Sequence, residues 1–306
     1  MQRTTSRGLL AATLIVLTAV SSTAGCGSDP AGAPSHRGLK ISSIPDQDPE
    51  KLAARDGAMA RYLSEALGIE VEYVPVTDYA ASVALFRAGD LDFVFYGGLT
   101  GVQARLQVPG SVLVAQRDID AKFQSVFIAN ASTGIKPVSS VGELTVFKGR
   151  RFTFGSESST SGRLMPQYFL DQAGVAASDF SGTPGYSGSH DKTIDLVESG
   201  TYEAGALNIQ VWRSRMTAKT VDVSKVTPVF ITPEYHDYHW IAGPETDQRF
   251  GAGFTDRLRT AVLAIGGDDP EQAALLTLYG AKSFVATDPA NYQEIEAIGR
   301  KLKLVT

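Results

Sequence analysis

Three consecutive hydroxyl side chains, Ser159, Thr160 and Ser161, stand between a strand-like run and a helix-like segment. Phe152–Gly155 is aromatic and β-branched, and the apolar segment Leu164–Leu170 follows, so the hydroxyls fall at a helix start. The first turn of a helix carries unpaired N–H groups and a partial positive charge, and it binds tetrahedral oxyanions without a formal cation. Hydroxyls add donors that rotate to fit. Serine and threonine also cap helices routinely, so anion binding and simple capping remain alternatives for this cluster alone.

Five further polar clusters also follow predicted strands. Ligands of open α/β sheets bind beyond the carboxyl ends of the strands. A single cluster would mean little. Six polar clusters that converge from two separate parts of the fold indicate a ligand-binding cleft. The other five clusters are Pro45–Asp48, Thr77–Tyr79, Tyr96–Thr100, Ser187–Asp191 and Tyr235–His239.

The segments that carry these clusters alternate between strand and helix patterns. Pro49–Leu67 has apolar residues at helical spacing and is followed by Gly68, a typical residue beyond a helix end. Asp78 stands where a helix cap is expected. Alternation of this kind predicts a parallel α/β sheet. Strands are predicted at Leu39–Ile44, Glu70–Pro75, Leu91–Tyr96, Ser111–Gln116, Phe123–Ala129, Phe152–Gly155, Thr183–Tyr186, Glu203–Leu207 and Val226–Thr232.

The order of these segments predicts two α/β lobes joined by a hinge. The chain crosses near Ala129 and again near Thr232. The first lobe then consists of residues 39–129 and 233–306, and the second of residues 130–232. The last part of the chain is predicted to be mostly helical and to complete the first lobe.

The N-terminus has the pattern of an export signal. Two arginines precede the apolar run Leu9–Val20, which is too short to span a bilayer, and small residues lead to Cys26. Residues 1–25 are therefore predicted to be a signal peptide. The small-small-Cys ending resembles a bacterial lipobox, so we expect lipidation of Cys26 at the outer face of the cytoplasmic membrane and a flexible tether over residues 26–38. An ordinary cleaved signal with an unrelated cysteine is the alternative.

Without this leader the chain is acidic. Removal of residues 1–25 takes away two arginines and leaves 26 basic against 33 acidic side chains, a formal charge of −7. No basic tract suits nucleic acid. Because Cys26 is the only cysteine, an intramolecular disulfide is excluded. An acidic protein that binds an anion must do so with local dipoles and hydrogen-bond donors.

Several motifs together resemble a known family. The runs Ser159–Gly162, Gly188–Asp191 and Gly200–Ala206 are similar to those in substrate-binding proteins of phosphate, phosphite and phosphonate ABC importers. The resemblance covers about residues 39–300. A closer likeness is to the branch named for selenate binding, and it rests on Ile44–Asp48, Val76–Ser82, Gly97–Arg105 and Gly188–Asp191.

The resemblance implies a type II periplasmic-binding-protein fold, with a ligand cleft between two α/β lobes. It implies a tetrahedral oxyanion as ligand (selenate, phosphonate, phosphite or phosphate) and an ABC permease and ATPase as partners. We expect a monomer that is not an enzyme and that needs no cofactor or metal. The ligand-binding residues that the resemblance implies are Tyr79, Tyr96, Ser159, Thr160, Ser161 and His190.

Other polar residues have competing interpretations. Asn208 follows a predicted strand and could donate an amide hydrogen to the ligand, and Asp237 could accept one. Asp191 is expected to cap its helix or orient the histidine before it, because a carboxylate repels an anion. His236 and His239 have too few companion ligands to predict a metal site. The predicted tyrosine donors could instead pack in the core.

The identity of the oxyanion depends on which carboxylates face the cleft. Selenate and sulfate only accept hydrogen bonds at neutral pH, so a site of donors alone favours them. Phosphate, phosphite and methylphosphonate can still carry a proton, which a buried carboxylate accepts. Asp46, Asp48, Asp191 and Asp237 are possible acceptors, and the sequence leaves both classes open.

Two other function classes are considered. A hydrolase would use Ser159 or Ser161 with His190, but the chain lacks a nucleophile-elbow pattern. A ligand sensor of the same fold would signal to a membrane kinase. Neighbouring genes for an ATPase and a permease, rather than for a kinase, would distinguish transport from sensing.

Overall fold

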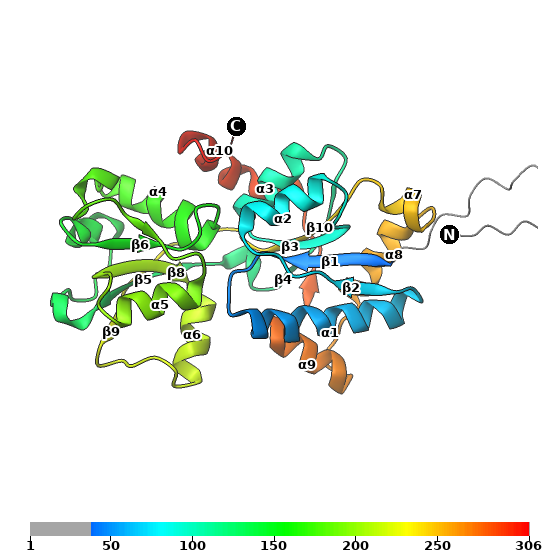
Figure 1. Cartoon of the computed structure of the whole chain (residues 1–306), viewed down its shortest axis with the longest axis horizontal. Coiled ribbons are helices and arrows are strands. Elements are labelled where there is room, and N and C mark those ends of the chain that lie inside the picture. The colour runs from blue at the N-terminus through cyan, green and yellow to red at the C-terminus, as the bar shows by residue number, and fades with distance from the viewer. Residues whose placement is uncertain (1–37, 306) are drawn as a thin grey trace, which may run out of the picture. The chain divides into compact units, whose positions relative to one another are not determined.

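The structure is a computed structural model that describes residues 38–305 (Figure 1). The predicted signal peptide, the predicted lipidation site at Cys26 and the tether up to residue 37 lie outside this range. Within residues 38–305, no helix has both the length and the apolar character to cross a membrane.

Two β-sheets organise these residues, and helices cover both faces of each (Figure 1). The first sheet has six strands in the order β11-β4-β10-β3-β1-β2, and the second has five in the order β7-β6-β8-β5-β9. The strands of the first sheet are β1 (Leu39–Ser43), β2 (Val71–Tyr73), β3 (Phe93–Tyr96), β4 (Val112–Arg117), β10 (His239–Ala242) and β11 (Phe284–Val285). Those of the second sheet are β5 (Ser125–Asn130), β6 (Phe152–Phe154), β7 (Gly185–Tyr186), β8 (Ala204–Asn208) and β9 (Val226–Ile231).

Both sheets are mixed, which corrects the prediction of a parallel sheet. β10 runs antiparallel to β3 and β4, and β5 runs antiparallel to β8 and β9. Both β10 and β5 enter their sheets from a linker between the two lobes. No βαβ crossover therefore constrains them to run parallel to their neighbours. No strand was predicted at His239–Ala242, of which only His239 was noted from the sequence, as the last residue of the polar cluster Tyr235–His239.

Two linkers, residues 118–124 and 232–238, join the sheets. They lie side by side, because the Phe123 N–H donates to the Tyr235 carbonyl and the Tyr235 N–H donates to the Phe123 carbonyl, both at 2.9 Å. The predicted first crossing near Ala129 places β5 in the first lobe, whereas strand pairing places β5 in the second sheet. We therefore propose that the first crossing lies within residues 118–124.

The helices follow the sequence pattern closely. α1 spans Pro49–Leu67 as predicted, and Gly68 ends it in the left-handed conformation with φ of 68°. The Asp78 carboxylate caps α2 by accepting the Ala81 N–H at 2.8 Å. The remaining helices are α2 (Tyr79–Arg87), α3 (Gly98–Gln107), α4 (Met165–Gln172), α5 (His190–Glu198), α6 (Ile209–Thr217), α7 (Thr246–Phe250), α8 (Phe254–Leu263), α9 (Pro270–Tyr279) and α10 (Gln293–Lys301).

A π-helical turn, η4 (Thr160–Leu164), leads into α4 and carries the hydroxyl cluster. The Leu164 N–H donates to the Ser159 carbonyl five residues back, at 2.9 Å, and the Met165 N–H donates to the Thr160 carbonyl. Bonds between residues five apart define a π turn, which is wider than an α turn. This turn therefore presents the hydroxyls differently from a regular helix start.

Pro166 explains the irregular turn. Its ring has no N–H, so the carbonyls four and five residues before it need other donors. The Gly162 carbonyl accepts the Gly155 N–H at 2.8 Å, and the Ser161 carbonyl accepts the Ser125 hydroxyl at 2.7 Å. The sequence predicts that this proline distorts or tightens the first turns of the helix. The first turn is distorted, but it is wider than an α turn and not tighter.

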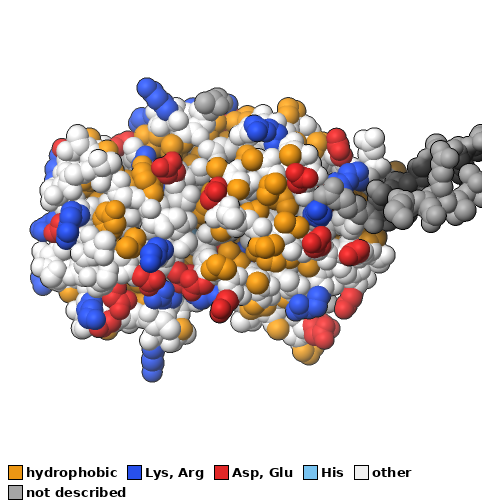
Figure 2. All heavy atoms as spheres, in the orientation of Figure 1, with side chains coloured by type: hydrophobic (Ala, Val, Ile, Leu, Met, Phe, Trp, Pro, Cys, Tyr) orange, Lys and Arg blue, Asp and Glu red, His pale blue; other side chains and the backbone are white. Residues whose placement is uncertain are grey.

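The surface offers no concentrated positive charge on the face shown in Figure 2, where acidic and basic side chains are interspersed. The whole chain has a formal charge of −5. Attraction by an exposed basic surface would need such a concentration. The face shown in Figure 2 therefore has no basic surface that would attract an anion.

Candidate functional site

The N-termini of α3 and η4 meet between the two lobes. The Gly98 N–H, at the start of α3, donates to Asp237 Oδ1 at 2.8 Å. The Leu99 N–H donates across the lobes to Thr160 Oγ1 at 2.9 Å. A Cβ at Gly97 would lie 3.2 Å from Thr160 Oγ1 and 3.3 Å from Asp237 Oδ1, so this close approach favours glycine. The positive ends of two helices from different lobes therefore face the same region.

Three buried polar atoms lie beside this meeting point and have no hydrogen-bond partner within residues 38–305. They are the Tyr79 hydroxyl, Asp46 Oδ1 and Asp237 Oδ2. Burial raises the pKa of Tyr79, and the charge of Asp46 raises it further, so the hydroxyl keeps its proton. The Ser159 hydroxyl is near enough to affect the Tyr79 pKa, but it does not meet hydrogen-bond geometry. Since buried polar groups are normally paired, these atoms are the ones available to a ligand.

Asp237 holds its proton at an unusually high pH. Burial raises its pKa to about 7, although the hydrogen bond from the Gly98 N–H opposes this shift. The charge of Asp120 also raises the pKa, while Thr160 and Arg117 lower it. Near neutral pH the carboxyl group can therefore act as either donor or acceptor, and it can share one proton with a ligand.

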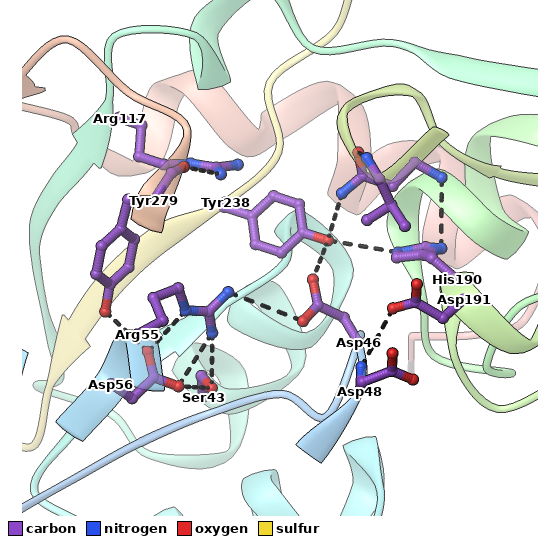
Figure 3. A network of polar contacts seen from close by, with 12 residues as sticks. Ser43, Asp46, Asp48, Arg55, Asp56, Arg117, His190, Asp191, Tyr238 and Tyr279 are labelled. Carbon is purple, nitrogen blue, oxygen red and sulfur yellow. Dashed lines mark hydrogen bonds and ion pairs between the residues drawn. The ribbon is translucent and has the colours of Figure 1, made fainter. Parts of the chain in front are cut away.

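His190 is held as a neutral hydrogen-bond donor. The backbone N–H of Asn208 donates to His190 Nδ1 at 3.3 Å, from which we assign the proton to Nε2 (Figure 3). Burial lowers the pKa of His190, so the ring is uncharged. Its Nε2 lies 3.4 Å from the Tyr238 hydroxyl. Because the ring nitrogens face Asn208 and Tyr238, neither is placed to activate Ser159 or Ser161 as a nucleophile.

Tyr238 connects the two lobes within the same cluster. Its hydroxyl donates to Asp46 Oδ2 at 2.8 Å and accepts from Asn208 Nδ2 at 3.1 Å (Figure 3). Its ring stacks on Phe95 of β3, with the ring centroids 5.4 Å apart. Packing therefore fixes the hydroxyl, which in turn fixes Asp46 Oδ2, whereas Asp46 Oδ1 has no hydrogen bond within residues 38–305.

A buried ionic network supports Asp46 from behind (Figure 3). Arg55 bonds Asp56 through Nε at 2.8 Å, and its NH1 lies 4.0 Å from Asp46 Oδ1. Although burial opposes its charge, Asp56 helps to hold the pKa of Arg55 above its ordinary value. The Tyr279 hydroxyl also donates to Asp56 at 2.8 Å. A cavity of about 230 Å³ borders this network, and its lining includes Asp46, Arg55 and Asn208.

The two histidines of the last polar cluster both contact Tyr292, and the His236 ring lies edge-on to it with centroids 5.9 Å apart. The His239 ring contacts Tyr292, with centroids 3.9 Å apart, and its Nδ1 lies 3.1 Å from the Asp237 carbonyl. Burial lowers the pKa of His239 to about 3. Within residues 38–305, no group of three or more His, Cys, Asp or Glu side chains could hold a metal ion.

The structure brings together most of the predicted ligand-binding residues. Tyr79, Ser159, Thr160, His190 and Asp237 are all buried around the meeting point of the two lobes. Their predicted contact with a ligand stays a prediction.

Tyr96 lies outside this group, and its predicted contact with a ligand also stays a prediction. Its hydroxyl donates to the Ser82 carbonyl at 2.9 Å, and its ring contacts Phe86 with centroids 5.8 Å apart. The proton is already committed inside the first lobe. On β3, Phe95 faces Tyr238, and the next side chain points to the opposite face of the sheet.

Ser161 and Asn208 lie one step behind the cluster. The Ser161 hydroxyl interacts with the Tyr235 hydroxyl of the second linker. Asn208 Oδ1 caps α6 by accepting two N–H groups, while its amide nitrogen bonds Tyr238. The side chains of both residues therefore position other groups. At Ser161 it is the backbone of the first turn of η4, and not the hydroxyl, that could donate to a ligand.

Sequence reasoning missed Tyr238 and left Asp46 as one of four possible acceptors. Tyr238 stands in a run of alternating polar residues, where nothing in the residue type separates it from Tyr235. Only the three-dimensional pairing of the two linkers and β3 shows which tyrosine reaches Asp46. The Arg55–Asp56 network was also missed, since its members look like ordinary surface charges of an amphipathic helix.

Comparison with known proteins identifies the family of this chain. A family model described as "ABC transporter, phosphonate, periplasmic substrate-binding protein" matches residues 41–292. The chain belongs to this family. Its members are substrate-binding components of ABC transporters, not enzymes, and this chain is therefore a periplasmic binding component of such a transporter.

Individual relatives support the same fold. The probable ABC transporter phosphite binding protein PhnD1 of Prochlorococcus marinus is 47% identical over 268 residues, which are 87% of this chain and 90% of that protein. The structure of PhnD1 in complex with methylphosphonate has a TM-score of 0.86 and matches 87% of this chain and 98% of that chain. A binding protein component of an ABC phosphonate transporter from Pseudomonas aeruginosa, 18% identical, has a TM-score of 0.75 over 87% of this chain and 86% of that chain. The predicted type II periplasmic-binding-protein fold is confirmed.

Asp237→Asn should reduce the pH dependence of stability of the ligand-free binding protein. The folded-state pKa is about 7, against an ordinary value of 3.8. The folded state therefore binds more protons between these values, and stability falls as pH rises through this window. We expect the decrease in Tm across the window to be smaller in Asp237→Asn than in the wild type.

The matched control is Asp256→Asn, which changes an exposed carboxylate paired with Arg259. This variant should keep the wild-type slope of Tm against pH. An unchanged slope in Asp237→Asn would contradict a raised pKa at this position.

Proposed function

We propose that this binding protein captures a small phosphorus oxyanion with an ionisable P–OH group, such as phosphite or methylphosphonate, and delivers it to its permease. The observation that carries this proposal is the grouping of the buried Tyr79 hydroxyl with one oxygen each of Asp46 and Asp237, three atoms without a hydrogen bond within residues 38–305. A donor beside two carboxyl groups suits a ligand that both accepts and donates hydrogen bonds.

The donors come from both lobes and carry no formal charge. The first lobe supplies the Tyr79 hydroxyl, and the second supplies the hydroxyls of Ser159 and Thr160. First-turn N–H groups of η4 complete the set, while the Nε2–H of His190 faces the Tyr238 hydroxyl beside it. An anion between the lobes would offset the facing positive ends of α3 and η4, so ligand binding and lobe closure would favour each other.

The carboxyl groups favour phosphorus oxyanions over selenate. A fully deprotonated anion would place an oxygen against Asp46 or Asp237 with no proton between them. That contact is repulsive, and burial strengthens the repulsion. This repulsion is absent when the ligand carries one proton or when Asp237 is protonated, because a proton then lies between the two oxygens. The names of two related proteins, which refer to phosphite and phosphonate, support the same choice.

Titration calorimetry with phosphite, methylphosphonate, phosphate, sulfate and selenate tests this proposal. We expect the protonatable phosphorus oxyanions to bind with a Kd in the micromolar range or lower, which corresponds to a favourable binding free energy of about 8 kcal/mol or more. Sulfate and selenate should bind about 100-fold more weakly, and Asp237→Asn should narrow that gap. Tighter binding of selenate would overturn the choice of ligand, and no binding of any anion would overturn the function.

Tyr79→Phe and Tyr96→Phe form a matched pair of variants. Tyr79→Phe removes a donor that has no hydrogen-bond partner within residues 38–305, so the affinity for the preferred anion should fall about tenfold or more while folding is retained. Tyr96→Phe leaves the Ser82 carbonyl without its donor, so it should lower Tm with little change in affinity. Equal affinities of Tyr79→Phe and the wild type would remove Tyr79 from the proposed site.

We also infer that Cys26 carries the lipid anchor and that the processed protein works at the outer face of the cytoplasmic membrane. The support is the position of the only cysteine, directly after a leader that ends in small residues.

Cys26→Ser should release the protein from the membrane fraction into the soluble fraction after export. Fractionation with detergent phase separation measures this, with the wild type as control. Equal partitioning of the two proteins would contradict the anchor.

A further inference from the structure

Asp191 joins the two lobes although it lies outside the proposed ligand cluster. It is the second residue of α5, and only 1% of its side chain is exposed. Arg215 of α6, in the same lobe, donates to Asp191 Oδ1 at 3.1 Å. From the first lobe, Lys51 Nζ donates to the same oxygen at 2.9 Å, and the Asp48 N–H donates to Oδ2 at 3.2 Å (Figure 3 shows the Asp48 contact).

A backbone hydrogen bond lies directly beside these contacts. The His190 N–H donates to the Asp46 carbonyl at 2.9 Å. Asp46 and Asp48 belong to the segment between β1 and α1, so this segment is bonded to the start of α5 at two successive points. His190 and Asp46 are also members of the proposed ligand cluster. The interlobe contacts of Asp191 therefore set the position of two groups that face the ligand.

We propose that Asp191 is a closure latch: Arg215 holds its carboxylate within the second lobe, and Lys51 with the Asp48 N–H fastens it to the first lobe when the lobes close. Asp191 is thus a positioning residue that sets the lifetime of the bound state. The effect on ligand dissociation rests on the proposed function, whereas the effect on lobe closure depends only on the contacts between the two lobes.

The contacts of Asp191 exclude the roles predicted for it from sequence. Ser189, not Asp191, caps α5, since the Ser189 hydroxyl accepts the Lys192 N–H at 3.3 Å. Both carboxylate oxygens of Asp191 accept hydrogen bonds from other groups, and the ring nitrogens of His190 contact Asn208 and Tyr238 instead. Burial opposes its ionisation, but the bonds from Lys51 and Arg215 hold the pKa of Asp191 below its ordinary value.

Substitution of Lys51 tests the latch without destabilising the fold of either lobe. Asp191 keeps Arg215, so no buried charge is left unpaired inside the second lobe. The Lys51 side chain is 45% exposed and also lies 3.6 Å from Asp48 Oδ2, so its loss costs little in the isolated lobe. Removal of Asp191 itself would leave Arg215 with Asp195 at 3.0 Å.

The matched control is Lys225→Met. Lys225 forms an exposed ion pair with Asp222 at 3.5 Å, within the second lobe and three residues apart. Lys51→Met and Lys225→Met remove the same charge, but only the first removes a contact between the lobes. Double substitution of Lys51→Met with Asp191→Asn tests whether the effect belongs to this pair.

The test measures the open–closed equilibrium and the dissociation rate. Single-molecule energy transfer between dyes at Glu65→Cys and Thr183→Cys, both exposed positions of different lobes, reports closure in a Cys26→Ser background. We expect Lys51→Met to lower the closed population and to raise koff for methylphosphonate about threefold, as loss of a partly exposed ion pair allows. Higher salt should reduce the closed population of the wild type more than that of Lys51→Met.

Three results overturn the latch: equal closed populations in Lys51→Met and the wild type, equal effects of Lys225→Met and Lys51→Met, or absence of any closed population with and without anions. Failure of the proposed function gives a different pattern, in which no anion changes the energy transfer of the wild type while the closed population without ligand still responds to Lys51→Met.

Discussion

The arrangement depends on one electrostatic constraint, which is that two helix N-termini from separate lobes point at the same region. Without a compensating group, the partial positive charges of α3 and η4 repel each other. The protein meets this constraint with Asp237 and Thr160, which accept the first N–H groups of α3. In η4 the Ser159 hydroxyl accepts the Gly162 N–H at 2.9 Å, so the N–H groups before Gly162 are the ones that an anion would bind. An acidic protein can therefore hold an anion through dipoles and hydroxyls that are already oriented.

Neutral donors need supports that fix their protons. His190 is useful only in the tautomer that carries a proton on Nε2, and the Asn208 backbone selects it. The Tyr238 hydroxyl has one proton, which goes to Asp46, and it accepts from Asn208. These supports come from the end of β8, the central strand of the second sheet, and from the second linker. The ligand cluster and the connection between the lobes are parts of one hydrogen-bond network.

Local pattern predicted the elements well, because their determinants are local. The ends of α1 follow from a proline and a glycine, and the start of α2 follows from the Asp78 cap. The antiparallel strands β5 and β10 were harder to place, since their partners are distant in sequence. The choice between Tyr96 and Tyr238 also lay beyond the sequence. Each is a tyrosine near the end of a strand or linker, and only the direction of the side chain separates a core role from a cleft role.

The π turn at Thr160–Leu164 has a consequence for how this family could diverge. A π turn holds one residue more than an α turn and can be read as a single inserted residue within a helix. Loss of one residue there would restore regular winding and rotate the preceding hydroxyls by about 100° around the helix axis. A one-residue deletion would thus turn the cluster away from the opposite lobe without removing any of its side chains. Gain or loss of ligand recognition in such a scaffold can therefore depend on the length of a turn as much as on the residues in it.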